Sequence, residues 1–300
     1  EGKFVEAGFY SGVAASDWSW GGLIFDADND GLSDIYVCNG ILNDVTDQDF
    51  IDFFANDVMQ KMALTGEKEK FDEIVNRMPS KPIPNKFFHN KGNLKFADEG
   101  NNWGFATPSF SNGAAYGDLD NDGDLDLIVN NVNDKAFIYR NNIREQQKEK
   151  NNYIAIQLKG DEKNTMAVGS QIKIYQGSQV LSREVIPSRG FQSSVDYKQI
   201  IGLGNGVADS MVIVWPDRTY SKYDKPAINK VLEIKQEKGR SVNEPVDFST
   251  TSLLSNVISS FDKHTEDDYI DFYNERNVPV MLSREGPQAT TADVNGDGLT

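Results

Sequence analysis

Short runs of β-forming residues recur along the chain, and turns rich in Gly, Asn and Asp separate them. In the first 150 residues, runs at 23–25 and 35–37 flank one acidic turn, and runs at 114–116 and 127–129 flank another. Such runs of β-branched and aromatic residues are typical of strands. The pattern therefore predicts a strand–loop–strand unit that occurs twice.

The repetition extends beyond the turns themselves. Residues 4–8 precede the first turn as residues 96–100 precede the second, at the same distance, and residues 19–21 align with 111–113. Self-similar β-units with a turn at a fixed register indicate a propeller or a β-array. The acidic turns begin at positions 26, 118 and 293, which are farther apart than one blade, so insertions are expected between them.

The segment at about 43–80 has a different pattern of apolar and polar residues. Apolar side chains follow helical spacing over residues 50–62, with Thr46 as the expected N-cap and Gly66 as the expected end of the helix. A second short helix is expected through residues 71–75. We expect the aromatic stripe of the first helix to pack against a blade rather than to bind a ligand.

Further strands follow this insertion. A hairpin is predicted with strands at 86–90 and 94–96. The glycines at 202–204 lack the third glycine and the following helix of a dinucleotide site, so we interpret them as a turn. Four more strands are predicted in a small β-domain, at residues 153–158, 171–175, 180–186 and 211–215.

These elements predict an all-β protein. Too few blades are predicted to close a propeller, so further blades are expected in a longer protein. The expected parts are a partial β-propeller at residues 1–150 with a helical insertion at about 43–80, a small β-domain at 151–236, a linker at 237–252 and the truncated first blade of a second propeller at 253–300.

The acidic turns share a nine-residue pattern that suits calcium. Oxygen ligands at positions 1, 3, 5 and 9 and a backbone carbonyl at position 7 would surround one ion, and Gly at position 6 allows the sharp turn. Without a cation, carboxylates this close would repel one another. The expected ligands are Asp26, Asp28, Asp30, the Leu32 carbonyl and Asp34; Asp118, Asp120, Asp122, the Asp124 carbonyl and Asp126; and Asp293, Asn295, Asp297 and the Leu299 carbonyl, the third copy ending before its ninth position.

EF-hands begin with the same pattern but need Glu at position 12 and a helix on each side. Position 12 is Val37 in the first copy and Val129 in the second, and the flanking residues favour strands. The loops are therefore not EF-hands. Acidic turns between strands can also occur without a metal. Three copies in the same frame make this interpretation weaker than calcium binding.

Composition narrows the classes of function. A net charge of −16 opposes nucleic-acid binding, because phosphate needs a basic surface. Cys38 is the only cysteine, which excludes a disulfide within the chain, and His89 and His264 are too few for a histidine-rich zinc site. No apolar run is long enough to predict a transmembrane helix. The chain is expected to be a part of a longer protein that continues at both ends. The lack of a signal peptide in this sequence is therefore no argument against export.

The acidic units resemble FG-GAP/VCBS repeats, the calcium-loop blades of integrin-type propellers. The later segment contains the motifs Val168-Gly169-Ser170, Ser188-Arg189-Gly190-Phe191-Gln192-Ser193, Gly202-Leu203-Gly204 and Val214-Trp215-Pro216-Asp217. Through these motifs it resembles the ASPIC/UnbV domain. The order of parts resembles long surface proteins of Bacteroidetes-type bacteria. This resemblance implies a cell-surface setting and a place as an accessory of an outer-membrane complex, with no catalytic residue carried over.

The sequence thus predicts a calcium-stabilised scaffold, extracellular or on the outer-membrane surface, that binds a protein or a glycan and is not an enzyme. Open calcium loops are weak sites that stay empty in cytosol, so export is expected. Glycan binding would use Trp18, Trp20 or Trp103 as stacking surfaces, although we favour packing between blades for all three. The enzymatic alternative is a glycosidase, which needs a carboxylate pair across a cleft.

Overall fold

The computed structural model describes residues 4–44, 46–66, 75–147, 151–161, 163–237, 240–241 and Thr265. Two compact units divide the chain, Glu1–Glu244 and Pro245–Thr300. Every element discussed below belongs to the first unit. The third acidic turn and the predicted strands around it lie outside the described residues, as does most of the predicted helix at 71–75.

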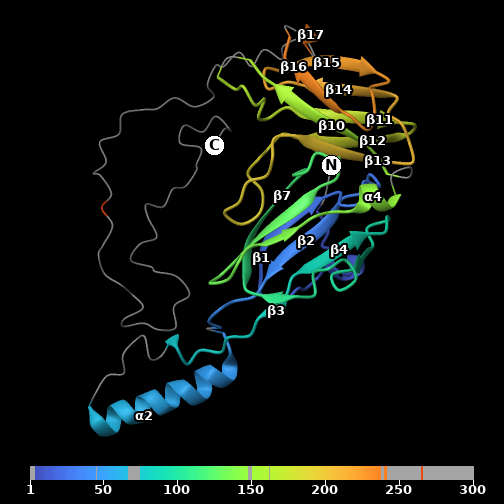
Figure 1. Cartoon of the computed structure of the whole chain (residues 1–300). Helices are drawn as coiled ribbons and strands as arrows, with labels where there is room; N and C mark the ends of the chain where they lie inside the picture. The colour runs from blue at the N-terminus through green and yellow to red at the C-terminus, as the bar shows by residue number, and fades with distance from the viewer. Residues whose placement is uncertain are drawn as a thin grey trace, which may run out of the picture. The chain divides into compact units, whose positions relative to one another are not determined.

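The repeat region, residues 4–147, contains two antiparallel sheets that each carry one acidic turn (Figure 1). The short strands β3 (Ile83–Pro84) and β6 (Pro108–Ser109) pair with each other. The first sheet has the order β1 (Ser19–Phe25), β2 (Asp34–Asn39), β4 (Lys86–Asn90) and β5 (Phe96–Asp98), and the second has β7 (Ser111–Gly117), β8 (Asp126–Asn131) and β9 (Phe137–Tyr139). The predicted strand–loop–strand units are confirmed, and no closed ring of blades is present among the described residues.

Alternation within the strands decides which side chains form the core of the repeat region. In β1, Leu23 and Phe25 are buried while Ile24 between them is 67% exposed. Aromatic rings fill the space beyond: Phe25 stacks on Tyr116 with ring centroids 4.9 Å apart, and Phe87 lies against Phe105 at 5.3 Å. Such buried rings stabilise the sheets through their large apolar area.

The sandwich module, residues 151–237 together with Arg240–Ser241, consists of two sheets around one apolar core. Its core includes Ile172, Ile174 and Trp215, all of which are fully buried. The three-stranded sheet has the order β13 (Gln199–Gly204), β10 (Asn152–Lys159) and β16 (Val231–Lys235); the five-stranded sheet has β12 (Gln179–Glu184), β11 (Gln171–Gln176), β14 (Ser210–Val214), β15 (Thr219–Asp224) and β17 (Arg240–Ser241). The last strand falls inside the range predicted as a linker.

Strand β10 joins the two parts of the chain because both of its faces are buried. Ile154 and Ile156 point into the core of the sandwich module. Tyr153 and Ala155, together with Ile200 from β13, belong instead to the core of the repeat region. A strand covered on both faces requires a nearly continuous apolar run, which is what residues 153–158 show.

Two interpretations from the sequence are wrong. Gly202-Leu203-Gly204 is not a turn but the end of β13, where the lack of side chains allows another backbone to come close. Thr46 does not cap the helix, because its hydroxyl donates to Asp44; Asp47 accepts the amide of Phe50 instead, at 2.8 Å.

The helical insertion is built differently from the prediction. It begins as a π-helix, η1 (Phe50–Phe54), and continues as α2 (Ala55–Thr65), ending at Gly66 as expected. Its apolar side chains do not form a core, since Phe53 is 75% exposed and Leu64 is 86% exposed. Helical spacing identified the helix but not what covers it. The remaining helices, α1 (Gly8–Ser11) and α4 (Ile143–Gln147), are short.

Candidate metal centre in each acidic loop

The first loop (residues 26–34) and the second loop (residues 118–126) have the same backbone. Position 4 has a positive φ in both, 57° at Asn29 and 62° at Asn121. Position 6 is glycine with φ of 91° at Gly31 and 99° at Gly123. Glycine and asparagine are the residues that adopt this left-handed conformation most readily. The sequence argument recognised the glycine and missed the asparagine.

The ninth residue of each loop anchors it to the sheet. Asp34 accepts the amide of Ala27 at 3.0 Å and that of Asn90 at 2.8 Å. Asp126 accepts the amide of Leu119 at 2.9 Å and that of Asn141 at 2.8 Å. Both carboxylates are almost fully buried. Position 9 therefore fixes the loop to its own second residue and to the chain beyond the neighbouring strand.

In the first loop, carboxylate oxygens of Asp26, Asp28 and Asp34 lie within 4.8 Å of one another. Asp26 also accepts the amides of Asp30 at 3.1 Å and Gly31 at 2.9 Å, which holds the turn closed. A second group at the rim consists of Asp28, Asp30 and His89, where the Nε2 atom of His89 lies 3.2 Å from Asp28.

In the second loop, the carboxylates of Asp118, Asp120 and Asp122 form a group from positions 1, 3 and 5, and Asp122, Asp124 and Glu145 form another. Three carboxylate oxygens are buried without a hydrogen-bond donor among the described residues: Asp118 Oδ1, Asp122 Oδ2 and Asp124 Oδ1. Buried polar atoms in native structures nearly always have a partner. Because Asp122 belongs to both carboxylate groups of this loop, a cation there is a partner that these anionic oxygens would accept.

The electrostatics of the loops indicate the same need for a cation. Burial raises the pKa of Asp26 well above its usual range, and the neighbouring carboxylates of Asp30 and Asp28 add to the effect. Burial is also the main cause that raises the pKa of Asp34 to about 7 and that of Asp124 to about 7. Anionic groups are destabilised in this way when they are buried together without a counter-charge.

The residues present fit a calcium ion. Three of the four groups among the described residues offer only carboxylate oxygens, and the fourth adds the imidazole of His89; hard oxygen ligands are what Ca²⁺ prefers. At position 7, the amide of Leu32 donates to Asp30 at 2.7 Å, and the amide of Asp124 donates to Asp122 at 3.1 Å. The third predicted set, from Asp293 to Leu299, lies outside the described residues.

Sequence reasoning missed several residues that hold the loops in place. The side-chain amide of Asn141 donates to the Ala27 carbonyl at 2.6 Å, and that of Asn29 donates to the Gly123 carbonyl at 3.0 Å. Lys198, from the sandwich module, reaches Asp118 at 3.0 Å. Contacts between residues so far apart in the chain leave no local pattern. The frequent asparagines near each loop were the one feature of the sequence that could have indicated these contacts.

Comparison with protein families decides what these units are. Residues 72–129 match the FG-GAP-like repeat, and residues 160–241 match ASPIC and UnbV. The chain therefore contains an FG-GAP-like repeat and an ASPIC/UnbV domain. The FG-GAP-like match includes the second loop. The first loop lies before the matched residues, but its backbone conformation is the same as that of the second loop. The ASPIC/UnbV match covers every strand of the sandwich module except β10. No curated protein matches the chain.

All three tryptophans that the sequence offered for glycan stacking make packing contacts. The rings of Trp18 and Trp20 lie 6.4 Å apart, and Trp20 contacts Phe191 of the ASPIC/UnbV domain at 5.2 Å. The indole N–H of Trp20 also donates to the Gly40 carbonyl at 2.7 Å. Trp103 packs on Phe87 at 4.8 Å but also lines a cavity of about 650 Å³ in the repeat region.

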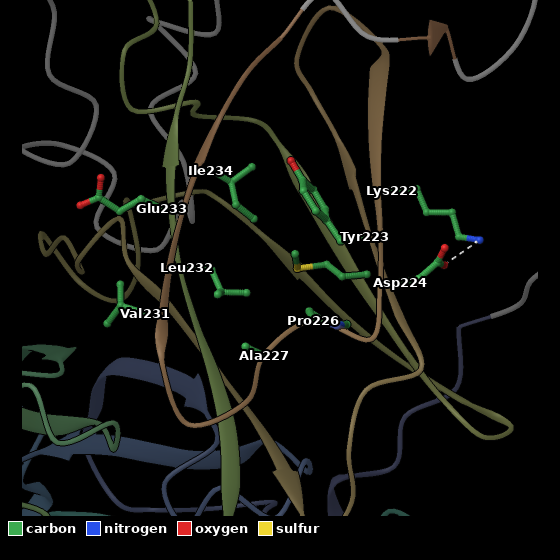
Figure 2. Close-up of a pocket in the computed structure, with 10 residues that line it drawn as sticks. Lys222, Tyr223, Asp224, Pro226, Ala227, Val231, Leu232, Glu233 and Ile234 are labelled. Carbon is green, nitrogen blue, oxygen red and sulfur yellow. Dashed lines mark ion pairs between the residues drawn. The ribbon is translucent and has the colours of Figure 1, made fainter.

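A second cavity, of about 570 Å³, lies in the ASPIC/UnbV domain between β16 and the five-stranded sheet (Figure 2). Its lining is largely apolar. Figure 2 shows the two carboxylates of the rim, Asp224 and Glu233, on opposite sides of the cavity. Asp224 pairs with Lys222 at 3.1 Å, and Glu233 pairs with Lys159 at 2.6 Å. Both carboxylates are therefore neutralised by surface lysines.

Proposed function

We propose that this protein is a calcium-stabilised scaffold of the extracellular space or the cell surface, which presents a binding surface for a protein or glycan partner. The observation that carries the calcium part is the second loop. Three buried carboxylate oxygens there have no donor among the described residues, and they belong to aspartates of the nine-residue pattern. FG-GAP-like repeats are typical of extracellular proteins, which supports the proposed location.

Calcium has a structural role in this proposal. A bound ion neutralises the carboxylates of positions 1, 3 and 5, while position 9 ties the loop to the sheet. Open loops of this kind bind in the range of about 10⁻⁴–10⁻³ M, which matches extracellular calcium and not cytosolic calcium. None of the described helices is long and apolar enough to cross a membrane.

Calorimetric titration of the intact chain with calcium chloride tests the proposal. We expect at least two ions per chain. Asp28→Asn in the first loop and Asp120→Asn in the second should each remove one ion, because each replaces a charged ligand in a different cluster. Asp134→Asn, at an exposed position outside the loops, is the matched control. Unchanged stoichiometry in both loop variants would contradict the assignment.

The location is tested separately. If the protein is displayed on an outer membrane as an accessory of a larger complex, protease added to intact cells should degrade it. Its cross-linked neighbours should be membrane proteins. Protection from protease until the cells are lysed would contradict surface display.

Glycan binding is the second candidate, and the cavity beside Trp103 is the observation that favours it. Aromatic rings, the amide of Asn102 and charged groups of Glu99 and Arg140 line this cavity. A sugar ring stacks on an aromatic face and takes hydrogen bonds from polar groups at its edge. Quenching of tryptophan fluorescence by an oligosaccharide panel should disappear in Trp103→Ala and persist in Trp18→Ala. Equal loss in both variants would exclude this cavity.

We assign no catalytic role to any residue of this chain. The carboxylate pair that a glycosidase requires would have to face a common pocket. In the cavity of Figure 2, the carboxylates of Asp224 and Glu233 are not directed toward each other, because each forms an ion pair with its own lysine. Release of sugar from a glycan panel by the intact protein, lost in Glu99→Gln or Asp224→Asn, would contradict this proposal.

A further inference from the structure

The sandwich module sits directly on the first loop. The amide of Gly204, at the end of β13, donates to the Asn29 carbonyl at 2.8 Å. Gly202 comes so close that an added Cβ would lie 2.5 Å from the Cα of Asn29 and closer still to the carboxylate of Asp26. Two glycines of β13 therefore allow this strand to pack closely against the first loop, which lies far away in the sequence.

The same module also contacts the second loop. The ring of Tyr153, on β10, occupies the space where a side chain at Gly123 would be. Lys198, just before β13, donates to the side chain and the carbonyl of Asp118, at 3.0 and 3.3 Å, and to the side chain of Asn121 at 3.1 Å. The lysine side chain is only 9% exposed and that of Asp118 is 1% exposed. This ion pair is thus buried at the contact.

Asp118 links the proposed ion to the sandwich module. Its Oδ2 atom accepts the hydrogen bond of Lys198, while its Oδ1 atom is buried without a donor, and Asp118 is a member of the group of loop carboxylates. The two loops are also joined to each other and to the module. Asn29 bonds to Gly123, and Asn151 donates to the carbonyl of Asp28.

We propose that the two acidic loops form one docking surface for the sandwich module, so that calcium in the loops controls how tightly this module is held on the repeat region. The inference rests on the proposed calcium function and adds a partner to it: the chain's own ASPIC/UnbV domain. Ligand position 1 is the point of coupling in the second loop, and the close approach of Gly202 is the point of coupling in the first.

The physical reason is the shape of the loops. Without a cation, the crowded carboxylates repel one another and the loops open. The loop surface against which Gly202, Gly204 and Tyr153 pack is then lost. The apolar contacts of Ala155 and Ile200 with the core of the repeat region remain. Removal of calcium should therefore loosen the module without releasing it.

Hydrogen exchange in the full chain measures this directly. In EGTA, a peptide covering residues 199–206 should exchange about ten-fold faster than in calcium chloride, because the Gly204 amide loses its acceptor at Asn29. A peptide covering β11, which lies within the module, should not change. Calorimetric titration of the same sample reports whether calcium binds at all.

Two pairs of variants sharpen the test. Lys198→Met should raise exchange at 199–206 in calcium while the number of bound ions stays the same; Lys222→Met, which removes an exposed lysine of the same module, should have no effect. Gly202→Ala should weaken calcium binding about ten-fold although Gly202 is not a ligand, since coupling between two sites is reciprocal. Gly22→Ala, where a Cβ meets nothing within 4 Å, is its control.

The outcomes separate the two proposals. Calcium binding together with faster exchange in EGTA and in Lys198→Met supports the docking surface. Calcium binding with unchanged exchange at 199–206 overturns it and leaves the scaffold proposal intact. Absence of calcium binding overturns both. Normal exchange in Lys198→Met would also overturn the coupling, as would normal calcium affinity in a folded Gly202→Ala. If Gly202→Ala folds poorly, the comparison of Lys198→Met with Lys222→Met decides alone.

Discussion

The first and second loops share a backbone but differ in their surroundings. Both turn through asparagine and glycine at positive φ, and both are anchored by the ninth aspartate. Around the first loop, the ion pair with a loop carboxylate among the described residues is that of His89 with Asp28. Around the second loop, Arg140 bonds to Asp120 at 2.7 Å and pairs with Glu145, while the buried Lys198 meets Asp118. Basic side chains from outside thus offset more of the second loop's charge.

This difference separates what the nine-residue pattern determines from what its neighbours determine. The pattern fixes the backbone and the positions of the carboxylates. The neighbouring side chains determine the net charge around the bound cation. They also determine which residues pack against the outside of the loop. The two loops should therefore respond alike when an anchor is removed and differently when a neighbouring charge is removed.

The largest effect is expected at the anchors. Asp34→Ala and Asp126→Ala should each lower the free energy of unfolding by about 3–5 kcal/mol, because each removes an almost fully buried carboxylate that accepts two backbone amides. The loss should persist in EDTA, since these hydrogen bonds do not need calcium. Chemical denaturation of both variants checks this. Asp217→Ala, which removes the acceptor of an exposed turn, is the control and should cost much less. Clearly unequal losses in the two loops would contradict their equivalence.

A smaller effect that depends on calcium is expected at Asp122. In calcium, Asp122→Ala should cost about 2–3 kcal/mol, because it removes a ligand that two clusters share. In EDTA the loss should shrink, because the substitution also removes repulsion against Asp124. Asp134→Ala, at an exposed position outside the loop, should change little under either condition. Equal losses for Asp122→Ala with and without calcium would indicate an ordinary turn.

The smallest effect concerns the basic neighbour of the second loop. Arg140→Gln should tighten calcium binding there by about three- to five-fold at low salt, since an exposed guanidinium competes weakly with the ion for Asp120. Binding at the first loop should not change, and high salt should reduce the difference. Lys222→Gln provides the control. If both loops tightened to the same extent in Arg140→Gln, their surroundings would not be separate.

The sequence was sufficient to predict the elements whose determinants are local. Strands on both sides of each acidic turn, the turn glycine and the end of α2 at Gly66 follow from neighbouring residues. The close approach of Gly202 to Asn29 does not, because its two partners are distant in the chain and neither has a distinctive local pattern. The glycines were for that reason interpreted as a turn.

The helical insertion shows a second limit. Apolar spacing predicts that a helix forms, and it does, but the spacing carries no information about what lies against the apolar side chains. Phe53 and Leu64 are exposed in the structure, although residues of this kind are usually buried. The calcium ligands fall between these two cases. Their clustering follows from local spacing, while the buried oxygens without donors appear only in three dimensions.

Thermal unfolding of the intact chain tests the central claim most directly, by comparison of EDTA, calcium chloride and magnesium chloride. An ion that binds only the native state stabilises it by mass action, which for two loops at ten- to hundred-fold excess over the dissociation constant amounts to about 3–5 kcal/mol. For a unit of this size, the midpoint should rise by about 10 °C in calcium. Magnesium should have little effect, because it retains its waters and resists irregular oxygen cages. The same midpoint in EDTA and in calcium would contradict the account.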